Sequence, residues 1–309
     1  MAFWENYHQP ASVGDALDQL RRYAGAARVV AGGTDLLLDL QQGRHPPVAA
    51  LVDVTRIPEM TTVDVVDGLI YIGAAVTHTA IVASPLLAQH ATCLVESCGV
   101  IGGPQVRNAA TLGGNVAHAL PAGDGTLALV ALEAEAQIAT MPQPPASGPQ
   151  LEWRPIGSLY QGPGKSAVDP TRELIVRFRL RPCEPGEASA FKRVMRPQGV
   201  ALPILGLAAW VRVAEGVVDE VRLALGPAGP TPLRAARAEA YLTGLPLAPE
   251  VLPQLADLVL QDARLRTSPH RATAEYRREL ILPLLQRALT LAVRRAVAGQ
   301  AAPESAEEG

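Results

Sequence analysis

The stretch from Ile101 to Thr126 places the strongest constraint on how this chain can fold. It reads IGGPQVRNAATLGGNVAHALPAGDGT, with six glycines and almost no charge in a run that should be buried. Glycine has no Cβ, so it accepts positive φ and lets a backbone come close to a neighbour or a ligand. Successive backbone N–H groups exposed in this way are suited to binding anions. We therefore expect a phosphate-bearing ligand here.

A second glycine run, AGGTD at Ala31 to Asp35, lies well upstream, with Gly33 preceding Gly113 by 80 residues. Either run alone is also compatible with an ordinary turn, and the first lacks the G-x-G-x-x-G pattern of dinucleotide-binding folds. The TLGGN segment at Thr111 to Asn115 offers a hydroxyl, two bare glycine N–H groups and an amide. Together the runs predict two turns that hold one diphosphate from two sides.

Composition limits the class of protein. A chain of 309 residues suggests two domains, and 48% hydrophobic with 18% charged residues is typical of a globular protein. The net charge of −3 gives no basic surface for nucleic acid or an anionic membrane. The start MAFWENYHQP is unlike a signal peptide, and no apolar run is long enough to span a bilayer. We expect a cytoplasmic protein.

The three cysteines, Cys93, Cys98 and Cys183, lack the spacing of a zinc or iron–sulfur site, and we interpret them as buried apolar side chains. No set of residues suggests metal binding or catalysis on a substrate. His78 and His118 are weak candidates for a base, and His118 is interpreted as a core histidine. The arginines from Arg264 to Arg278 are interpreted as a solvated or subunit-facing surface.

Hydrophobic periodicity predicts an α+β organisation in both halves. Asp-Gly at Asp67-Gly68 and Glu-Gly at Glu215-Gly216 predict hairpins. Expected helices cover Ser12 to Tyr23, Ser84 to Cys98, Leu233 to Leu242, Pro249 to Asp262 and Thr273 to Val297. Expected strands include Arg28 to Ala31, Ala50 to Val54, Leu174 to Leu180, Ala201 to Val213 and Val217 to Gly226. Leu36 to Leu40 is interpreted as a buried element, and Met141 to Pro149 as a surface loop.

The two glycine runs, with further segments along the chain, resemble those of the FAD-binding medium subunits of the molybdenum hydroxylases, the family of carbon monoxide dehydrogenase and xanthine dehydrogenase. The resemblance covers nearly the whole chain. It includes LVDVTRIPE at Leu51 to Glu59, GAAVTH at Gly73 to His78, LGPAGPTPLRA at Leu225 to Ala235 and TAEYRRELI at Thr273 to Ile281. It implies a PCMH-type FAD-binding domain at 1–180, with α+β subdomains of about 1–58 and 59–180. A C-terminal α+β domain with an antiparallel sheet and helices follows at 187–297, before a flexible tail at 298–309.

The resemblance also implies one non-covalently bound FAD. The matched cofactor-binding positions are Val29, Val30, Ala31, Gly32, Gly33, Thr34, Asp35 and Leu36 around the first diphosphate loop, and Thr111, Gly113, Gly114 and Asn115 in the second. Ile101 matches a position against the isoalloxazine. Ile175 and Lys192 match positions that close over the flavin, where the Lys192 ammonium would favour the reduced anionic form.

Asp124 lies between Gly123 and Gly125 and has two interpretations. Its carboxylate can cap the helix that follows, or it can accept hydrogen bonds from the hydroxyls of a nucleotide. The resemblance favours the second, because Asp124 matches a position that contacts the sugar-like chain of FAD.

Two departures from the family pattern stand out. The loop after Lys192 reads RPQGV at Arg196 to Val200 and lacks the usual acidic residues, so we expect it to shield the flavin differently. Some relatives hold an extra iron–sulfur cluster with four cysteines. Met141 to Gly164 has no cysteine, so we expect none here.

The function implied is electron transfer inside a larger complex. Substrate would be oxidised on a molybdenum-cofactor large subunit, and electrons would pass through a [2Fe–2S] small subunit to this FAD and then to NAD⁺, oxygen or a quinone. A heterotrimer, perhaps doubled, is the family arrangement. Two alternatives stay open: a self-contained flavin-dependent oxidoreductase with its own substrate pocket, and a non-catalytic partner-binding protein that keeps only the fold.

Overall fold

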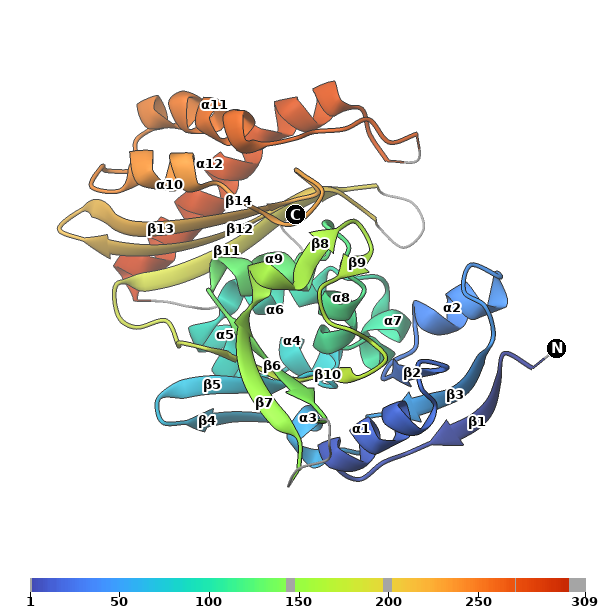
Figure 1. The fold of residues 1–309 in the computed structure, drawn as a ribbon. Coiled ribbons are helices and arrows are strands. Elements are labelled where there is room, and N and C mark those ends of the chain that lie inside the picture. Colours follow the sequence, from blue (N-terminus) through green and yellow to red (C-terminus); the bar gives the residue numbers. More distant parts are fainter. Residues whose placement is uncertain (1, 143–147, 197–201, 270, 300–309) are drawn as a thin grey trace. The chain divides into compact units, whose positions relative to one another are not determined.

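The structure is a computed structural model that describes residues 2–142, 148–196, 202–269 and 271–299 (Figure 1). The chain forms two compact units. Unit 1 consists of the described chain up to His78, Gln105–Ala119 and Ala134–Arg181, and unit 2 of Thr79–Pro104, Leu120–Glu133 and the described chain from Pro182 onward. Both units mix helices with strands, so the predicted α+β class is confirmed.

The first part of unit 1 is a three-stranded parallel sheet in the order β1-β3-β2, formed by β1 (Trp4–His8), β3 (Val48–Asp53) and β2 (Ala27–Val30). Helix α1 (Val13–Arg22) begins as predicted, because the Ser12 hydroxyl accepts a hydrogen bond from the Asp15 N–H at 3.1 Å. Helix α2 (Leu36–Gln41) buries only Leu40. Its interpretation as a buried element was wrong, because one six-residue helix at the surface presents most of its side chains to solvent.

The second part of unit 1 is a five-stranded antiparallel sheet in the order β4-β5-β10-β6-β7. Its strands are β4 (Val63–Val66), β5 (Leu69–Gly73), β10 (Glu173–Leu180), β6 (Glu135–Thr140) and β7 (Gln150–Pro155). The predicted hairpin joins β4 to β5, with positive φ at Asp67 and Gly68. Smaller elements complete the unit: α3 (Pro58–Thr61), α7 (Pro104–Ala109), α8 (Leu112–Ala117), the 3₁₀ turn Ile156–Leu159, β8 (Tyr160–Gly162) and β9 (Lys165–Ser166).

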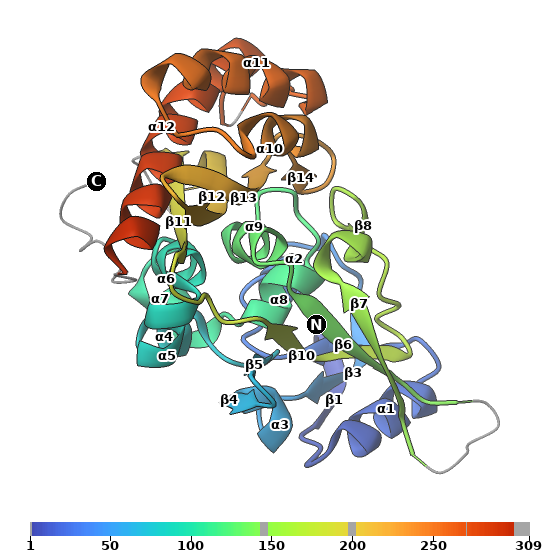
Figure 2. The same ribbon diagram turned by 90° about the vertical axis from the view of Figure 1, so that its left-hand side faces the viewer.

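Unit 2 is organised around a four-stranded antiparallel sheet in the order β11-β12-β13-β14. Its strands are β11 (Glu187–Met195), β12 (Pro203–Ala214), β13 (Val217–Gly226) and β14 (Leu233–Arg234). The predicted hairpin at Glu215 and Gly216 joins β12 to β13. Helices α10 (Ala236–Leu242), α11 (Leu252–Asp262) and α12 (Ala274–Ala298) lie together on one side of these strands (Figure 2). The helix expected from Leu233 begins later, because Leu233 and Arg234 pair with β13.

The other face of this sheet packs against α6 (Thr92–Gly99) and α9 (Asp124–Ala131), whose eight residues are all buried. Small residues permit the contact: a Cβ on Gly226 would lie 2.1 Å from the Pro121 carbonyl oxygen. The helix predicted over Ser84 to Cys98 is two helices, α5 (Pro85–His90) and α6, after the short α4 (His78–Val82). They separate at Ala91, whose backbone is not helical.

Several predicted segments lie partly or wholly outside the described residues: 143–147 of the expected surface loop, 197–200 of the RPQGV loop, and 300–309 of the tail. Within the described part of the chain, no helix is long and apolar enough to cross a membrane. The same residues contain no cluster of histidine, cysteine and carboxylate side chains suited to a metal ion.

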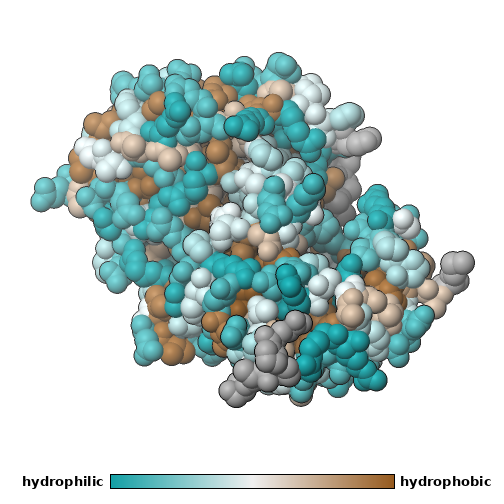
Figure 3. Space-filling model, viewed as in Figure 1, coloured by the Kyte–Doolittle hydropathy of each residue, from teal (hydrophilic) through white to brown (hydrophobic). Residues whose placement is uncertain are grey.

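Apolar side chains are interspersed among hydrophilic ones on the surface shown in Figure 3. In unit 1 the exposed large apolar side chains come from separate elements, such as Tyr7 on β1, Val65 on β4 and Leu151 on β7. Isolated exposed apolar residues are ordinary. The candidate site is therefore located from the glycine loops and the buried charges.

The fold predicts a strong difference between two glycines of unit 1. A Cβ at Gly73, the last residue of β5, would lie 2.2 Å from the carbonyl carbon and oxygen of Met60, whereas a Cβ at Gly157 would meet nothing within 4 Å. Gly73→Ala should lower the free energy of unfolding by about 3 kcal/mol, and Gly157→Ala should change it by less than about 0.5 kcal/mol. Denaturant unfolding followed by circular dichroism measures both. Equal stability of the two variants would contradict the packing described.

Candidate functional site

The two glycine runs meet in unit 1. A Cβ on Gly32 would lie 2.0 Å from the carbonyl oxygen of Ala109 and 2.9 Å from the Cα of Ala110, so the first loop packs directly on the backbone that leads into the second. Gly33 has a φ of +67°, which favours glycine. Segments that are 80 residues apart in the sequence therefore form one structure.

The second loop is held by bonds within unit 1. Thr111 caps α8, and its hydroxyl accepts a hydrogen bond from the Gly114 N–H at 3.1 Å. The Gly113 N–H donates to the Ala74 carbonyl at 2.8 Å, and a Cβ on Gly113 would lie 2.6 Å from that oxygen. The prediction of two bare glycine N–H groups was wrong, because both already have acceptors. Gly113 serves close packing, while Gly114 is exposed at the surface of the loop.

The first loop presents backbone differently. It joins β2 to α2, and Asp35 is the N-cap residue of α2 but makes no side-chain capping hydrogen bond. The first N–H groups of a helix have no acceptor within the helix itself, and here the Leu37 N–H donates to the Gly33 carbonyl at 2.9 Å. The Asp35 carboxylate instead lies 3.6 Å from Nδ1 of His118, which follows α8. This contact gives the two loops a second connection.

The burial of His118 and His78 differs from what the sequence predicted. The His118 side chain is 31% exposed and beside Asp35, so its interpretation as a core histidine was wrong. His78 is the core histidine: it is 1% exposed, and its backbone N–H donates to the Ala110 carbonyl at 3.0 Å. Burial, with a smaller effect of the nearby Arg107, lowers the pKa of His78 to about 4. A neutral, enclosed imidazole is poorly placed to exchange protons with a substrate.

Asp124 is a buried carboxylate at the first position of α9. Its Oδ2 accepts a hydrogen bond from Nη1 of Arg193 at 2.5 Å, and the two side chains are 4% and 5% exposed. Burial raises the pKa of Asp124 to about 6, against the opposing effect of Arg193. Oδ1 has no hydrogen-bond partner among the described residues. The helix-capping interpretation was therefore wrong, because the carboxylate bonds to an arginine and not to the start of its helix.

The other predicted positions occupy separate places in the two units. Ile175 in unit 1 is buried on β10, beside an irregularity in its pairing with β6. Ile101 in unit 2 is partly exposed just beyond α6, where its N–H donates to the Cys98 carbonyl. Lys192 in unit 2 is partly exposed on β11, opposite Leu207 of β12.

Arg193 is the residue that sequence reasoning missed. The available signal was Asp124 itself, because a carboxylate inside an apolar run needs a buried counter-charge. In the arginine run before and within α12, interpreted as a solvated or subunit-facing surface, Arg264, Arg266 and Arg278 are exposed, whereas Arg277 is buried. Arg277 is 1% exposed, and its Nη1 donates to the Pro227 carbonyl at 3.0 Å. Burial, reinforced by Arg271 and Arg266, lowers the pKa of Arg277.

Comparison with known families gives a match over both parts of the chain. Residues 2–181 match the FAD binding domain in molybdopterin dehydrogenase, and residues 189–292 match the CO dehydrogenase flavoprotein C-terminal domain. The chain belongs to the FAD-binding medium subunits of the molybdenum hydroxylases. FAD is its cofactor, and it is a flavoprotein oxidoreductase subunit.

Individual relatives of this FAD-binding subunit agree with the assignment. It is 31% identical to the xanthine dehydrogenase FAD-binding subunit of Escherichia coli O157:H7, over 93% of this chain and 96% of the relative. The carbon monoxide dehydrogenase medium chain of Hydrogenophaga pseudoflava is 27% identical, with the same coverage. Among solved structures, carbon monoxide dehydrogenase from that organism matches with a TM-score of 0.86, over 94% of this chain and 98% of the other.

The residues present fit such a cofactor. The first loop offers backbone at an uncapped helix start, and the second keeps an exposed glycine at its surface. In unit 2, Asp124 Oδ1 and Arg193 Nε are buried polar atoms without a hydrogen-bond partner among the described residues. Buried polar groups are nearly always bonded in folded proteins. An acceptor and a donor left open on a bonded pair of side chains suit a ligand that carries hydroxyl groups.

Burial of His78 predicts a pH dependence of stability. Its folded pKa of about 4 lies below the usual 6.5, so the unfolded chain takes up the proton first, and stability is lost as pH falls from about 6.5 to about 4. The loss from this group should approach ~1.4 kcal/mol per pH unit in that window. Unfolding free energies of the wild type and His78→Asn between pH 4 and 7 measure it. The variant should show a shallower slope, and parallel slopes would contradict the assignment.

Proposed function

We propose that this subunit takes electrons from a [2Fe–2S] partner subunit and passes them to NAD⁺, oxygen or a quinone, with bound FAD supplying the redox chemistry. The observation that carries the proposal is the direct packing of two glycine loops in a chain of this family. Substrate would be oxidised on a molybdenum-cofactor large subunit, in a heterotrimeric complex located in the cytoplasm. The relatives named above support this arrangement, since one is described as a FAD-binding subunit and another as a medium chain.

Unit 1 would bind the diphosphate of FAD. The proposed residues are Val29 to Leu36 in and around the first loop, with Thr111, Gly113, Gly114 and Asn115 in the second. Gly32 and Gly113 would act through packing, because a Cβ on either would overlap neighbouring backbone. The exposed Gly114 and the start of α2 would provide the surface that the phosphates approach.

The remaining predicted residues would serve the rest of the cofactor. Ile101 and Ile175 offer apolar side chains for the isoalloxazine, and the Asp124 carboxylate offers an acceptor for hydroxyl groups. Lys192 would place a positive charge near the flavin. In the same proposal, residues 1–180 form the FAD-binding domain and 187–297 the C-terminal domain.

A self-contained flavin enzyme is the competing function, and the structure offers it less support. Such an enzyme needs an accessible acid or base beside its substrate. His78 is enclosed, and His118 lies beside Asp35 at the glycine loops. Turnover of a small substrate by the isolated, FAD-loaded chain would favour this alternative.

Gly114 allows a sharp test of the diphosphate loop. It has an ordinary φ, and a Cβ there would lie 3.2 Å from the Thr111 hydroxyl oxygen, a contact that a small shift can relieve. Gly114→Ala should raise the dissociation constant of FAD by about tenfold, equivalent to ~1.4 kcal/mol, because its methyl group occupies the surface that the phosphates approach. Titration of the apo chain with FAD, followed by flavin fluorescence, measures the change.

Gly14→Ala is the matched control. Gly14 also lies in the first turn of a helix behind a hydroxyl cap, with its Cβ position 3.8 Å from the Ser12 hydroxyl oxygen, and it is remote in sequence from both loops. Its affinity for FAD should equal that of the wild type. Equal affinities for all three proteins would reject the proposed loop, and failure of the wild type to bind FAD would reject the proposed function.

The electron acceptor can be identified directly. The FAD-loaded full chain, reduced under nitrogen with a stoichiometric amount of dithionite, would be mixed separately with NAD⁺, oxygenated buffer and a soluble quinone, and the return of flavin absorbance followed. One acceptor should reoxidise the flavin at least about tenfold faster than the others, since orientation at a binding site accelerates transfer. Equal slow rates with all three would contradict acceptor-specific electron transfer by this subunit.

A further inference from the structure

Arg193 joins three segments of unit 2. From β11, its Nη1 donates to Asp124 Oδ2 at 2.5 Å, at the start of α9. Its Nη2 donates to the carbonyl of Val100, which follows α6, and lies 3.2 Å from the sulfur of Met195. Val100 immediately precedes Ile101. One buried guanidinium thus holds two places in unit 2 where the chain carries proposed FAD contacts.

The pleat of β11 selects Arg193 for this role over its neighbour Lys192. Successive strand residues point to opposite faces of a sheet. Ala190 is buried in the core formed with α10, α11 and α12, and Val194 packs against that core, so Lys192 lies on that face. Phe191 lies on the other face, where its N–H donates to Glu96 of α6, and Arg193 points the same way.

The geometry of the pair is incomplete without a further group. A planar guanidinium and a carboxylate commonly form two parallel hydrogen bonds. Here Asp124 Oδ1 and Arg193 Nε have no partner among the described residues, although both atoms are buried. The pair therefore leaves one acceptor and one donor unused. A hydroxyl group, which both donates and accepts, can satisfy either atom.

We propose that Arg193 is a positioning residue for FAD: it fixes the Asp124 carboxylate so that Oδ1 can accept a cofactor hydroxyl, and it ties the Val100 carbonyl, with Ile101, to the same point. This inference rests on the proposed function only for the identity of the ligand. The dependence of Asp124 on Arg193 is a property of the chain alone.

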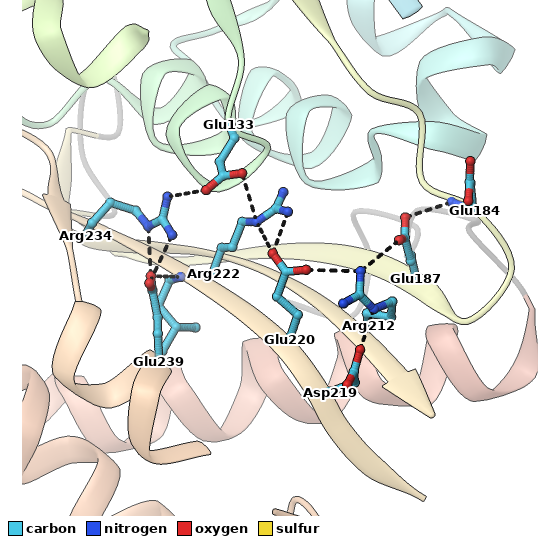
Figure 4. A network of polar contacts seen from close by, with 10 residues as sticks. Glu133, Glu184, Glu187, Arg212, Asp219, Glu220, Arg222, Arg234 and Glu239 are labelled. Carbon is cyan, nitrogen blue, oxygen red and sulfur yellow. Dashed lines mark hydrogen bonds and ion pairs between the residues drawn. The ribbon is translucent and has the colours of Figure 1, made fainter. Parts of the chain in front are cut away.

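Other charged and titratable groups also surround α9. Against the effect of burial, Arg271, in the segment before α12, lowers the pKa of Asp124 electrostatically, and the Asp124 charge in turn adds to burial in raising the pKa of the Cys98 thiol of α6. Glu96 of α6 is already bound by Arg295 at 2.5 Å. Arg222 of β13 pairs with Glu133 and Glu220, beyond the far end of α9 (Figure 4). Arg193 alone bonds to the Asp124 carboxylate among the described residues.

The first experiment needs no cofactor. In the full apo chain, Arg193→Gln should lower Tm by roughly 5–10 °C at pH 8, where Asp124 is ionised and loses its counter-charge. The loss should be smaller at pH 5, because the pKa of Asp124 is about 6 and the neutral carboxyl needs no counter-charge. The double variant Asp124→Asn/Arg193→Gln should recover part of the loss at pH 8. Strictly additive effects of the two substitutions would overturn the proposal.

The second experiment measures FAD affinity against pH from 5.5 to 8.5. In the wild type, affinity should fall as pH drops through about 6, because protonated Asp124 is a poorer acceptor. Without Arg193 the pKa of Asp124 rises, so Arg193→Gln should move this midpoint to higher pH and weaken binding at pH 7 by about tenfold or more. Arg193→Lys, which keeps the charge, should restore the midpoint. Asp124→Asn should bind weakly at every pH.

Arg222→Gln is the control. Arg222 is another mostly buried arginine of the same sheet, 4.0 Å over the Trp210 ring, and its substitution should leave the pH profile unchanged. Coincident profiles for Arg193→Gln and the wild type would overturn the positioning role. If the proposed function itself is wrong, the result is different: the wild type binds no FAD, whereas the coupling of Arg193 to Asp124 in the apo chain persists.

Discussion

Backbone-to-backbone contact at glycine is the constraint on which unit 1 depends. Gly32 lies against the carbonyl of Ala109, Gly73 against Met60 and Gly113 against Ala74, each too close for a Cβ. The contacts of Gly113 and Gly32 bring together segments that are 39 and 77 residues apart in the sequence. Any side chain at these positions would separate the loops by more than a rotamer change could repair. The glycine loops are therefore a structural joint first, and the surface they form follows from that joint.

Unit 2 depends on buried charge in the same way that unit 1 depends on glycine. Asp124 with Arg193 and Glu96 with Arg295 are nearly enclosed ion pairs, and each ties a helix on one face of the sheet to a residue outside that helix. Such pairs gain little net stability, because desolvation offsets their attraction. They do fix geometry, since moving either partner leaves an unpaired charge. For a subunit that must hold a cofactor in a defined position, fixed geometry is the useful property.

Glycine packing and buried charge both agree with the proposal that this subunit positions a cofactor and leaves substrate chemistry to another chain. Among the described residues near the glycine loops, His78 is the enclosed histidine. Its pKa is lowered, and its side chain packs in the core. Asp124 has a raised pKa, yet its partner is an arginine and its open oxygen suits a hydroxyl donor. The charges of the site thus favour binding and orientation of FAD.

The sequence by itself determined the family, the α+β class, the two hairpins and the identity of the glycine loops, because these depend on local patterns and short motifs. Gly33 acts locally through its positive φ, and Ser12 acts locally by accepting a capping hydrogen bond from the N–H three residues later. Only the tertiary structure decided which residues contact one another across the fold. It showed that the Gly113 N–H is already bonded, that His118 faces Asp35, and that Arg193 holds Asp124. Arg193 lies 69 residues from Asp124, and no pattern in the sequence connects the two residues. Their burial and pairing arise only when the strands and helices pack.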